Sequence, residues 1–301
     1  MTTRAARSTT SLLGAWCYTD GMPIVLALGS AIVYGVSDYL GGRVSRRWPP
    51  VVVALAAELT VLLITVALVP VIEPTGPSGR AVWWGIVGGV AGSAGVLGLY
   101  AALSHGNMTV VAPVTGIVAA IVPVAIGVAL GERPSTVTSG GIVLAVVAVA
   151  LIGGIVGVGH QRLDAGILLL AVAVGSGFGL LFVAYSRTGD DAGTWPLLMS
   201  RIGATPLLVA AFVVAHRRGG MPPLRPAVAL PGAAIGVLIL VANGLYLIAA
   251  RDGLLTVVAV LVALYPASTV AFAALLDHER ASRWQITGMG VAAIAVALIT
   301  V

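Results

Sequence analysis

Ionisable side chains inside long apolar runs are the residues of this sequence with the clearest capacity for chemistry. Glu58 lies about eight residues into the run 51–72, which places it roughly 10 Å deep at 1.5 Å per residue of helix. A carboxylate in hydrocarbon costs at least ~2.5 kcal/mol, so such a residue is a functional candidate by default. Glu58 is therefore predicted to exchange a proton, with a bond to a neighbouring helix as the alternative. Asp38 is the second proton-coupling candidate, although a solvated helix end is its simpler interpretation.

Arg201 lies about two turns into another apolar run, 194–215. A long guanidinium side chain can extend along the helix and place its charge at the membrane interface, which is the favoured interpretation. It can equally bind an anionic substrate or pair with an acid across the bundle.

Uncharged polar and aromatic side chains within the apolar runs form the predicted substrate wall. These residues are Tyr34, Ser37, Tyr100, Ser176, Phe178, Asn243, Tyr246 and Tyr265. Asn243 precedes Tyr246 by three residues, so both lie on one face of a helix. Hydroxyl and amide groups in hydrocarbon need hydrogen-bond partners, so bonds between helices and contacts with a ligand are equally good interpretations.

Ten apolar segments must position these side chains. The chain has 301 residues, of which 59% are hydrophobic and 9% charged, too few charges to coat a soluble domain. Segments of about 20 residues are long enough to cross ~30 Å of hydrocarbon as helices. They cover 22–40, 51–72, 81–103, 108–130, 136–158, 163–186, 194–215, 227–250, 254–276 and 283–301. The sequence therefore predicts an all-α integral membrane protein with ten transmembrane helices.

An internal repeat divides the ten segments into two sets of five. At an offset of 147 residues, Trp48-Pro49 recurs as Trp195-Pro196, Glu132-Arg133 as Glu279-Arg280, and Gly141 as Gly288. At an offset of 146, Gly29-Ser30 recurs as Gly175-Ser176. Because five is odd, the halves must have opposite orientations, as in the inverted repeats of many secondary transporters. We predict a lead-in over 1–21, a first five-helix repeat over 22–158 and a second over 159–301.

Two motifs resemble those of a known protein family. The pattern Gly131-Glu132-Arg133-Pro134-Ser135, with Gly141 nine residues after Glu132, resembles the signature of EamA-type repeats in the ten-helix branch of the drug/metabolite transporter superfamily. The segment 34–42 and the prolines Pro113 and Pro123 are similar to other parts of that family. The second copy departs from the pattern, since His278 replaces the glycine and Val260 stands where Pro113 stands.

The resemblance covers about residues 22–301. It implies a multi-pass exporter of metabolites, amino acids or drugs in the cytoplasmic (inner) membrane, driven by an ion gradient and working by alternating access. The implied partners are a small organic substrate, protons as the candidate coupling ion, and the lipid bilayer, for a monomer or homodimer. The alternative from another class is a non-transporting scaffold or flippase-type subunit.

Several functions have no support in the sequence. It contains neither a His-x-x-x-His nor a Cys-x-x-Cys metal spacing, so we predict no enzyme, no cofactor and no metal site. The arginines occur one to three at a time between apolar runs, which argues against nucleic-acid binding. The repeated Glu132-Arg133 pair is predicted to form a cap or gate, and pairs such as Gly85/Gly89 and Gly175/Gly179 to pack helices closely.

Two criteria for the membrane orientation disagree, and we keep the orientation that the resemblance implies. The resemblance implies that both termini lie in the cytoplasm. The positive-inside rule favours the opposite orientation, because the loops on one side carry nine arginines and those on the other six.

Overall fold

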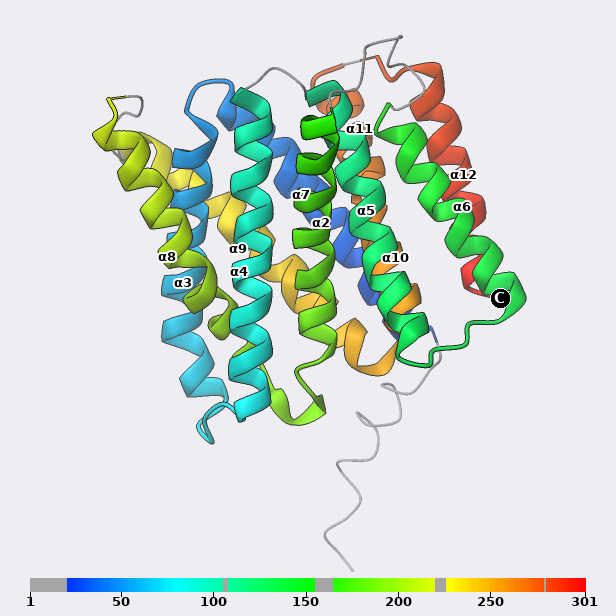
Figure 1. The fold of residues 1–301 in the computed structure, drawn as a ribbon, viewed down its shortest axis with the longest axis horizontal. Coiled ribbons are helices and arrows are strands. Elements are labelled where there is room, and N and C mark those ends of the chain that lie inside the picture. The colour runs from blue at the N-terminus through cyan, green and yellow to red at the C-terminus, as the bar shows by residue number, and fades with distance from the viewer. Residues whose placement is uncertain (1–20, 105–107, 155–164, 220–225, 279) are drawn as a thin grey trace, which may run out of the picture.

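The computed structural model describes residues 21–104, 108–154, 165–219, 226–278 and 280–301. In this part of the chain every regular element is a helix, and the helices form one bundle with two ends (Figure 1). They are α2 (Met22–Ser45), α3 (Pro50–Ile72), α4 (Gly79–Ser104), α5 (Met108–Ala129), α6 (Thr136–Ile152), α7 (Ala165–Ser186), η2 (Asp190–Ala192), α8 (Trp195–Arg217), α9 (Pro226–Asp252), α10 (Leu255–Ala263), α11 (Tyr265–Leu276) and α12 (Arg283–Ile299). We name the two ends of the bundle after α2, as the Met22 end and the Ser45 end.

The membrane character predicted from the sequence is confirmed. Seven helical stretches in the described residues are long and apolar enough to cross a membrane, with the consecutive α10 and α11 forming one of them, Leu255–Leu276. Three shorter apolar helices accompany them: Pro113–Ala129, Thr136–Ile152 and Arg283–Ile299. Each of the ten predicted segments contains helix.

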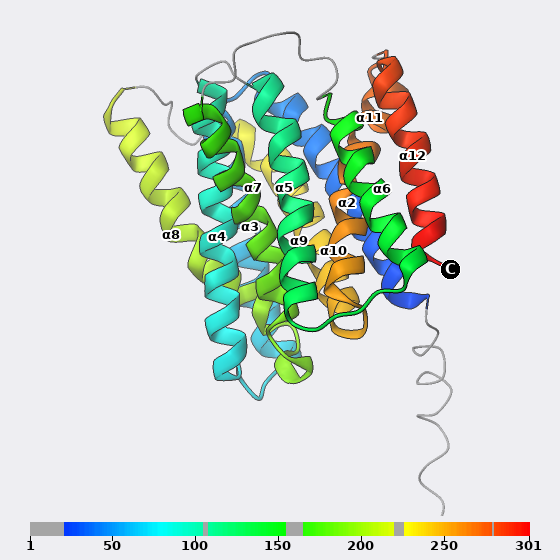
Figure 2. The ribbon, with the colours of Figure 1, turned by 45° about the vertical axis from the view of Figure 1, so that its right-hand side comes forward.

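The pair α6 and α12 shows how the two repeats are related in space. A methyl group added to Gly141 would lie 2.7 Å from Ile299 Cγ1, and one added to Gly288 would lie 2.8 Å from Ile152 Cγ1. Gly141 and Ile152 become Gly288 and Ile299 at the repeat offset of 147 residues, so the two contacts are copies of each other. The start of each helix packs on the end of the other, so the two are antiparallel neighbours (Figure 2).

Glycine-lined contacts join the remaining helices in corresponding pairs. Gly85 and Gly89 of α4 lie against Met199 and the Ser200 carbonyl of α8. Their repeat equivalents Gly232 and Gly236, in α9, lie against Ala56 and Ala57 of α3. Gly175 and Gly179 of α7 likewise lie against α5, which confirms the predicted close packing. Small residues allow backbones to approach where lipid provides no hydrophobic drive for helix association.

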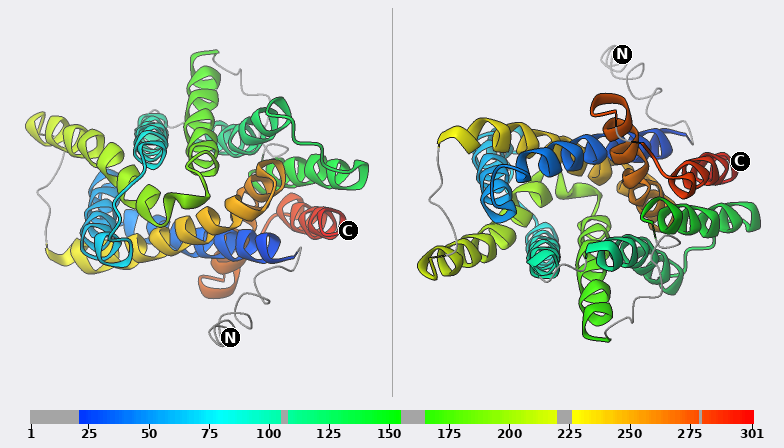
Figure 3. Two further views of the ribbon diagram at one scale, coloured as in Figure 1. Left: turned by 90° about the horizontal axis from the view of Figure 1, so that it is seen from below. Right: turned by 90° about the horizontal axis from the view of Figure 1, so that it is seen from above.

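The helix pair α10 and α11 breaks the symmetry of the repeats. The predicted segment 254–276 is two helices, because α10 ends at Ala263 and α11 begins at Tyr265, with Pro266 in the first turn of α11. Every residue of α10 is buried, since it packs among α2, α5, α6 and α9, whereas α11 contains no buried residue. Figure 3, which views the bundle along its helices, shows the orange α10 near the centre and the darker α11 toward the outside. The equivalent α5 is one helix.

Candidate functional site

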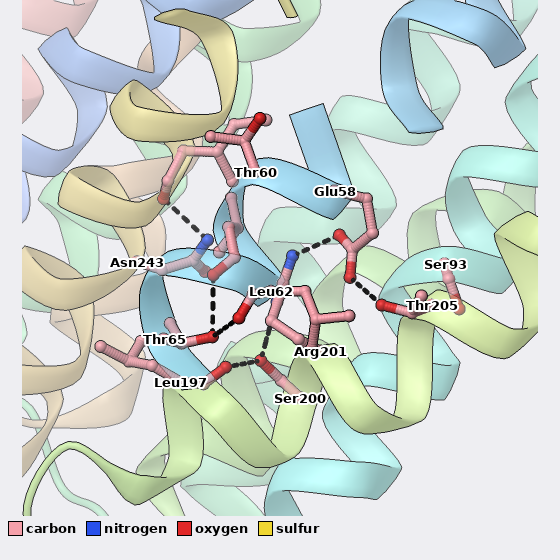
Figure 4. A network of polar contacts seen from close by, with 12 residues as sticks. Glu58, Thr60, Leu62, Thr65, Ser93, Leu197, Ser200, Arg201, Thr205 and Asn243 are labelled. Carbon is pink, nitrogen blue, oxygen red and sulfur yellow. Dashed lines mark hydrogen bonds and ion pairs between the residues drawn. The ribbon is translucent and has the colours of Figure 1, made fainter. Parts of the chain in front are cut away.

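A buried ion pair lies where α3 crosses α8. The Arg201 Nη1 atom donates to Glu58 Oε2 at 2.7 Å, and the Thr205 hydroxyl donates to Glu58 Oε1 at 3.0 Å. Glu58 and Arg201 are 6% and 8% exposed. Figure 4 shows the guanidinium pointing from α8 toward the carboxylate on α3. Arg201 therefore does not extend to the membrane interface, and the favoured interpretation of its side chain is wrong. The guanidinium instead neutralises an acid across the bundle.

The other side of the Arg201 guanidinium is held by hydroxyl groups. Its Nε and Nη2 atoms lie 3.3 and 3.2 Å from the Ser200 Oγ atom, which itself donates to the Leu197 carbonyl at 2.9 Å. The Tyr185 hydroxyl, on α7, lies 2.7 Å from the same Oγ atom. The pair is thus part of a largely buried polar network in which each charged group has more than one partner.

Sequence reasoning missed Tyr185, Ser200 and Thr205. One signal was present in the sequence, because Thr205 occupies the position equivalent to Glu58 at the repeat offset of 147 residues. Repeat-equivalent residues can contact each other only near the two-fold axis that relates the repeats. The bond between Thr205 and Glu58 is therefore a contact that the repeat symmetry allows. Tyr185 likewise corresponds to Tyr39 at the offset of 146 residues, whereas the position of Ser200 carried no comparable signal.

A second polar cluster joins α2, α9 and α11. The Tyr34 hydroxyl donates to Asn243 Oδ1 at 2.8 Å, and Asn243 Nδ2 donates to the Ile239 carbonyl at 2.9 Å. The Tyr265 ring, at the start of α11, has its centroid 6.2 Å from that of Tyr34. The Tyr34 ring also lies edge-on to that of Phe182, with centroids 6.4 Å apart. Phe182 packs on Tyr246, whose ring lies 6.3 Å from that of Tyr185, so aromatic rings connect the two clusters. The structure therefore brings together three of the predicted substrate-wall residues.

Asp38 lies beside this second cluster without a partner of its own. It follows Tyr34 by four residues, so both side chains lie on one face of α2. Its side chain is exposed, and it makes no hydrogen bond or ion pair with another described residue. Asp38 is thus a carboxylate within a membrane-spanning helix that has no counter-charge among the described residues.

The other predicted wall residues lie in different surroundings. Ser37 is buried and donates to the Tyr34 carbonyl of its own helix, and Tyr246 is fully buried and donates to the Phe182 carbonyl. Ser176 is half-buried, and the half-buried Phe178 lies against Gly95 of α4. The side chain of Tyr100 lies outside the described residues. A part for these five in substrate binding stays a prediction.

The Glu132 carboxylate caps the break between α9 and α10. It accepts from the backbone N–H groups of Leu255 and Thr256, both at 2.8 Å, where α10 begins. A negative group at a helix N-terminus satisfies unpaired amides and the positive end of the helix dipole. A small cavity of about 210 Å³ lies beside it, lined in part by Arg187 and Gly253. The predicted cap is confirmed for Glu132, whereas Glu279 lies outside the described residues.

The described residues do not supply a metal site. Nowhere among them do three or more His, Cys, Asp or Glu side chains come close enough to hold an ion. The side chains of the two clusters offer hydrogen bonds and aromatic contacts.

Comparisons with known proteins agree with this geometry. The model of the EamA-like transporter family matches residues 21–154 and again residues 165–301. A comparison with curated proteins finds no match. A solved structure described only as "Crystal structure of protein" has a TM-score of 0.74 at 15% sequence identity, over 91% of this chain and 95% of that one. At that identity the likeness concerns the fold, which the two chains share over almost their whole lengths.

Proposed function

The chain belongs to the EamA-like transporter family, whose model matches both of its halves, and on this premise we propose that it is a secondary active transporter of small organic molecules. In this proposal, ten membrane-spanning helices form two inverted five-helix repeats in the cytoplasmic membrane. The repeats alternate access to a substrate site that lies between them.

The observation that carries the proposal is the polar cluster of Tyr34, Asn243 and Tyr265 at the interruption between α10 and α11. Broken helices inside a membrane are tolerated where they are packed in protein or line a water-filled path, and transporters commonly bind substrates at such breaks. Tyrosine rings and an amide offer both apolar and hydrogen-bonding contacts to an organic molecule. The fully buried α10 provides a fixed wall, and the half-buried α11 packs against α2 on the outer side of the break.

We assign proton coupling to Asp38 rather than to Glu58. Both were candidates for proton coupling, but the Glu58 carboxylate is held by Arg201 and Thr205 and is nearly inaccessible. Protonating Glu58 would leave the Arg201 charge buried without a counter-charge, which is strongly unfavourable. Asp38 has no such partner among the described residues, and it is an exposed residue on the same face of α2 as Tyr34. It can therefore gain and lose a proton without breaking the core of the bundle.

Transport by the purified full chain in proteoliposomes tests the proposal. The vesicles contain a pH-sensitive dye, and a panel of amino acids, organic amines and organic acids is added one compound at a time. We expect at least one compound to change the internal pH in a saturable way, and an ionophore that collapses the gradient to stop its accumulation. Binding of a compound without any movement across the bilayer would instead favour a non-transporting scaffold or flippase-type subunit.

A further inference from the structure

The two ends of the bundle carry very different charge. Among the described residues, the Ser45 end has seven arginines and one acid: Arg43, Arg46, Arg47, Arg217, Arg218, Arg280, Arg283 and Asp277. Over the same ranges, the Met22 end has four arginines and five acids: Arg80, Arg133, Arg187, Arg251, Glu73, Glu132, Asp190, Asp191 and Asp252. All seven arginines of the Ser45 end are exposed. A strongly basic face at a helix end attracts anionic partners over a Debye length.

A groove of about 600 Å³ concentrates part of this charge. It lies where α2 and α11 end and where α3 and α9 begin, all at the Ser45 end. Its lining residues are Leu40, Arg43, Val44, Arg46, Arg47, Trp48, Ala227, Pro231 and Asp277. Arg43 is paired with Asp277 and donates to the Tyr39 hydroxyl, whereas Arg47 has no ion-pair partner among the described residues. The groove thus combines a positive rim with an apolar floor.

The groove is separate from the candidate transport site. Leu40 and Val44 follow Tyr34 and Asp38 by six residues each, which turns them about 120° around α2 at ~100° per residue. They pack with Trp48 against the cluster formed by α3 and α9, on another side of the helix from Tyr34. A ligand in this groove therefore contacts the outer side of the bundle at the level where helices meet the membrane interface.

We propose that this groove binds the headgroup of an anionic phospholipid. The guanidinium groups of Arg46 and Arg47 suit a phosphate, because their planar sets of N–H donors match its oxygens. Trp48 lies between the end of α2 and the start of α3, and tryptophan at the ends of membrane-spanning helices commonly anchors proteins to the interface. Leu40, Val44 and Pro231 provide the apolar surface along which the first part of an acyl chain lies. A soluble anion would bind the arginines without contacting this apolar surface.

Lipid titration of the purified full chain, followed by native mass spectrometry, tests the proposal. The probes are phosphatidylglycerol, phosphatidylcholine and soluble glycerol 3-phosphate. The test variant is Arg46→Gln/Arg47→Gln, and its matched control is Arg217→Gln/Arg218→Gln, which removes two exposed arginines from the same end but outside the groove. Each basic side chain near a membrane surface contributes roughly a fivefold factor, so the groove variant should bind phosphatidylglycerol about 30-fold more weakly.

The control variant should change this affinity by less than about threefold, since its charges lie away from the groove and are screened. If Arg46→Gln/Arg47→Gln does not fold, the single variant Arg47→Gln should still weaken binding about fivefold. Equal losses in the two double variants would overturn the proposal, because the charge of the whole face would then explain them. Equal binding of phosphatidylcholine would overturn it as well. Tight binding of glycerol 3-phosphate would identify a site for a water-borne anion.

Discussion

The first and second repeats share their packing residues but not the charged residues inside the bundle. Gly141 recurs as Gly288, and each lies against an isoleucine that recurs in turn, so the α6–α12 contact is built twice. Gly85 and Gly89 recur as Gly232 and Gly236 in the corresponding helix pairs. Positions that must admit a neighbouring backbone are the same in both halves.

The charged residues inside the bundle follow the opposite rule. Arg201 corresponds to Ala54, and Glu58 to Thr205, at the offset of 147 residues. Asp38 corresponds to the buried Ala184 at the offset of 146 that relates this part of the chain. The repeats therefore supply a symmetric scaffold, and single-copy polar residues make its interior asymmetric. Substitutions of repeated and unrepeated residues should affect stability and transport differently.

The largest expected effect comes from an unrepeated residue in the buried pair. Arg201→Leu leaves the Glu58 carboxylate buried without a counter-charge, and we expect it to lower the free energy of unfolding by about 3–5 kcal/mol. Unfolding in mixed detergent micelles measures this. Arg217→Leu, at the exposed end of the same helix, is the control and should change stability by less than ~0.5 kcal/mol. The double variant Glu58→Leu/Arg201→Leu should be more stable than Arg201→Leu alone. If the double variant were less stable than Arg201→Leu, the unpaired Glu58 carboxylate would not be the cause of the loss in Arg201→Leu.

Repeated glycines should give matched losses. A methyl group at Gly141 or Gly288 meets the side chain of the partner isoleucine at 2.7 or 2.8 Å, so either Gly→Ala variant should cost about 1–3 kcal/mol through overpacking. The two costs should agree within ~0.5 kcal/mol in the same unfolding measurement. Gly140→Ala is the control, because nothing lies within 4 Å of an added methyl group there. Clearly unequal losses would mean that the repeats do not pack symmetrically in solution.

A smaller effect separates the turns that precede Glu132 and Glu279. Gly131 has a φ of +99°, and His278 at the equivalent position keeps the left-handed conformation with a φ of +53°. This conformation costs roughly 1 kcal/mol for a residue with a Cβ atom, so His278→Gly should stabilise the protein by about that amount. Gly131→Ala should destabilise it similarly. Thermal unfolding of both variants checks the prediction. A loss of stability in His278→Gly would show that the His278 side chain makes a contact that stabilises the protein by more than the left-handed conformation costs.

The smallest effect on stability is expected at Asp38. Asp38→Asn should change the free energy of unfolding by less than ~0.5 kcal/mol, because the exposed carboxylate has no bonded partner to lose. Transport driven by a pH gradient should nevertheless be abolished in proteoliposomes. Asp252→Asn, an exposed acid at the Met22 end, is the control that should retain it. Proton-driven transport that survives in Asp38→Asn would remove the coupling role from this residue.

The sequence was sufficient to predict the scaffold and most of its helices. Apolar runs of span length and a repeated pattern at a constant offset are visible without any contacts. The break at Leu264 was not predicted, although Pro266 was visible, because proline alone does not decide such a break. Pro113 and Pro123 both lie inside the continuous helix α5. Whether a proline interrupts a helix depends on what the freed carbonyls and the neighbouring helices provide.

The sequence predicted several residues of the candidate site but not which of them bond to each other. Tyr34, Asn243 and Tyr265 were selected for polarity within apolar runs, and they do meet. The pairing of Glu58 with Arg201, 143 residues apart, was one of several interpretations and not the favoured one. Tyr185 and Ser200 were not selected at all, since a hydroxyl near a run of apolar residues is common.

What the sequence alone determined is that this chain is a repeated, helical membrane protein of the EamA-like family, because hydrophobic length and duplication are properties of the chain in one dimension. The tertiary structure decided which of its intramembrane charges are neutralised. Only the crossing of α3 with α8 puts a guanidinium 2.7 Å from Glu58, while no helix brings a cation to Asp38 among the described residues. Electrostatic energy at low dielectric depends steeply on such distances, and sequence separation does not contain them.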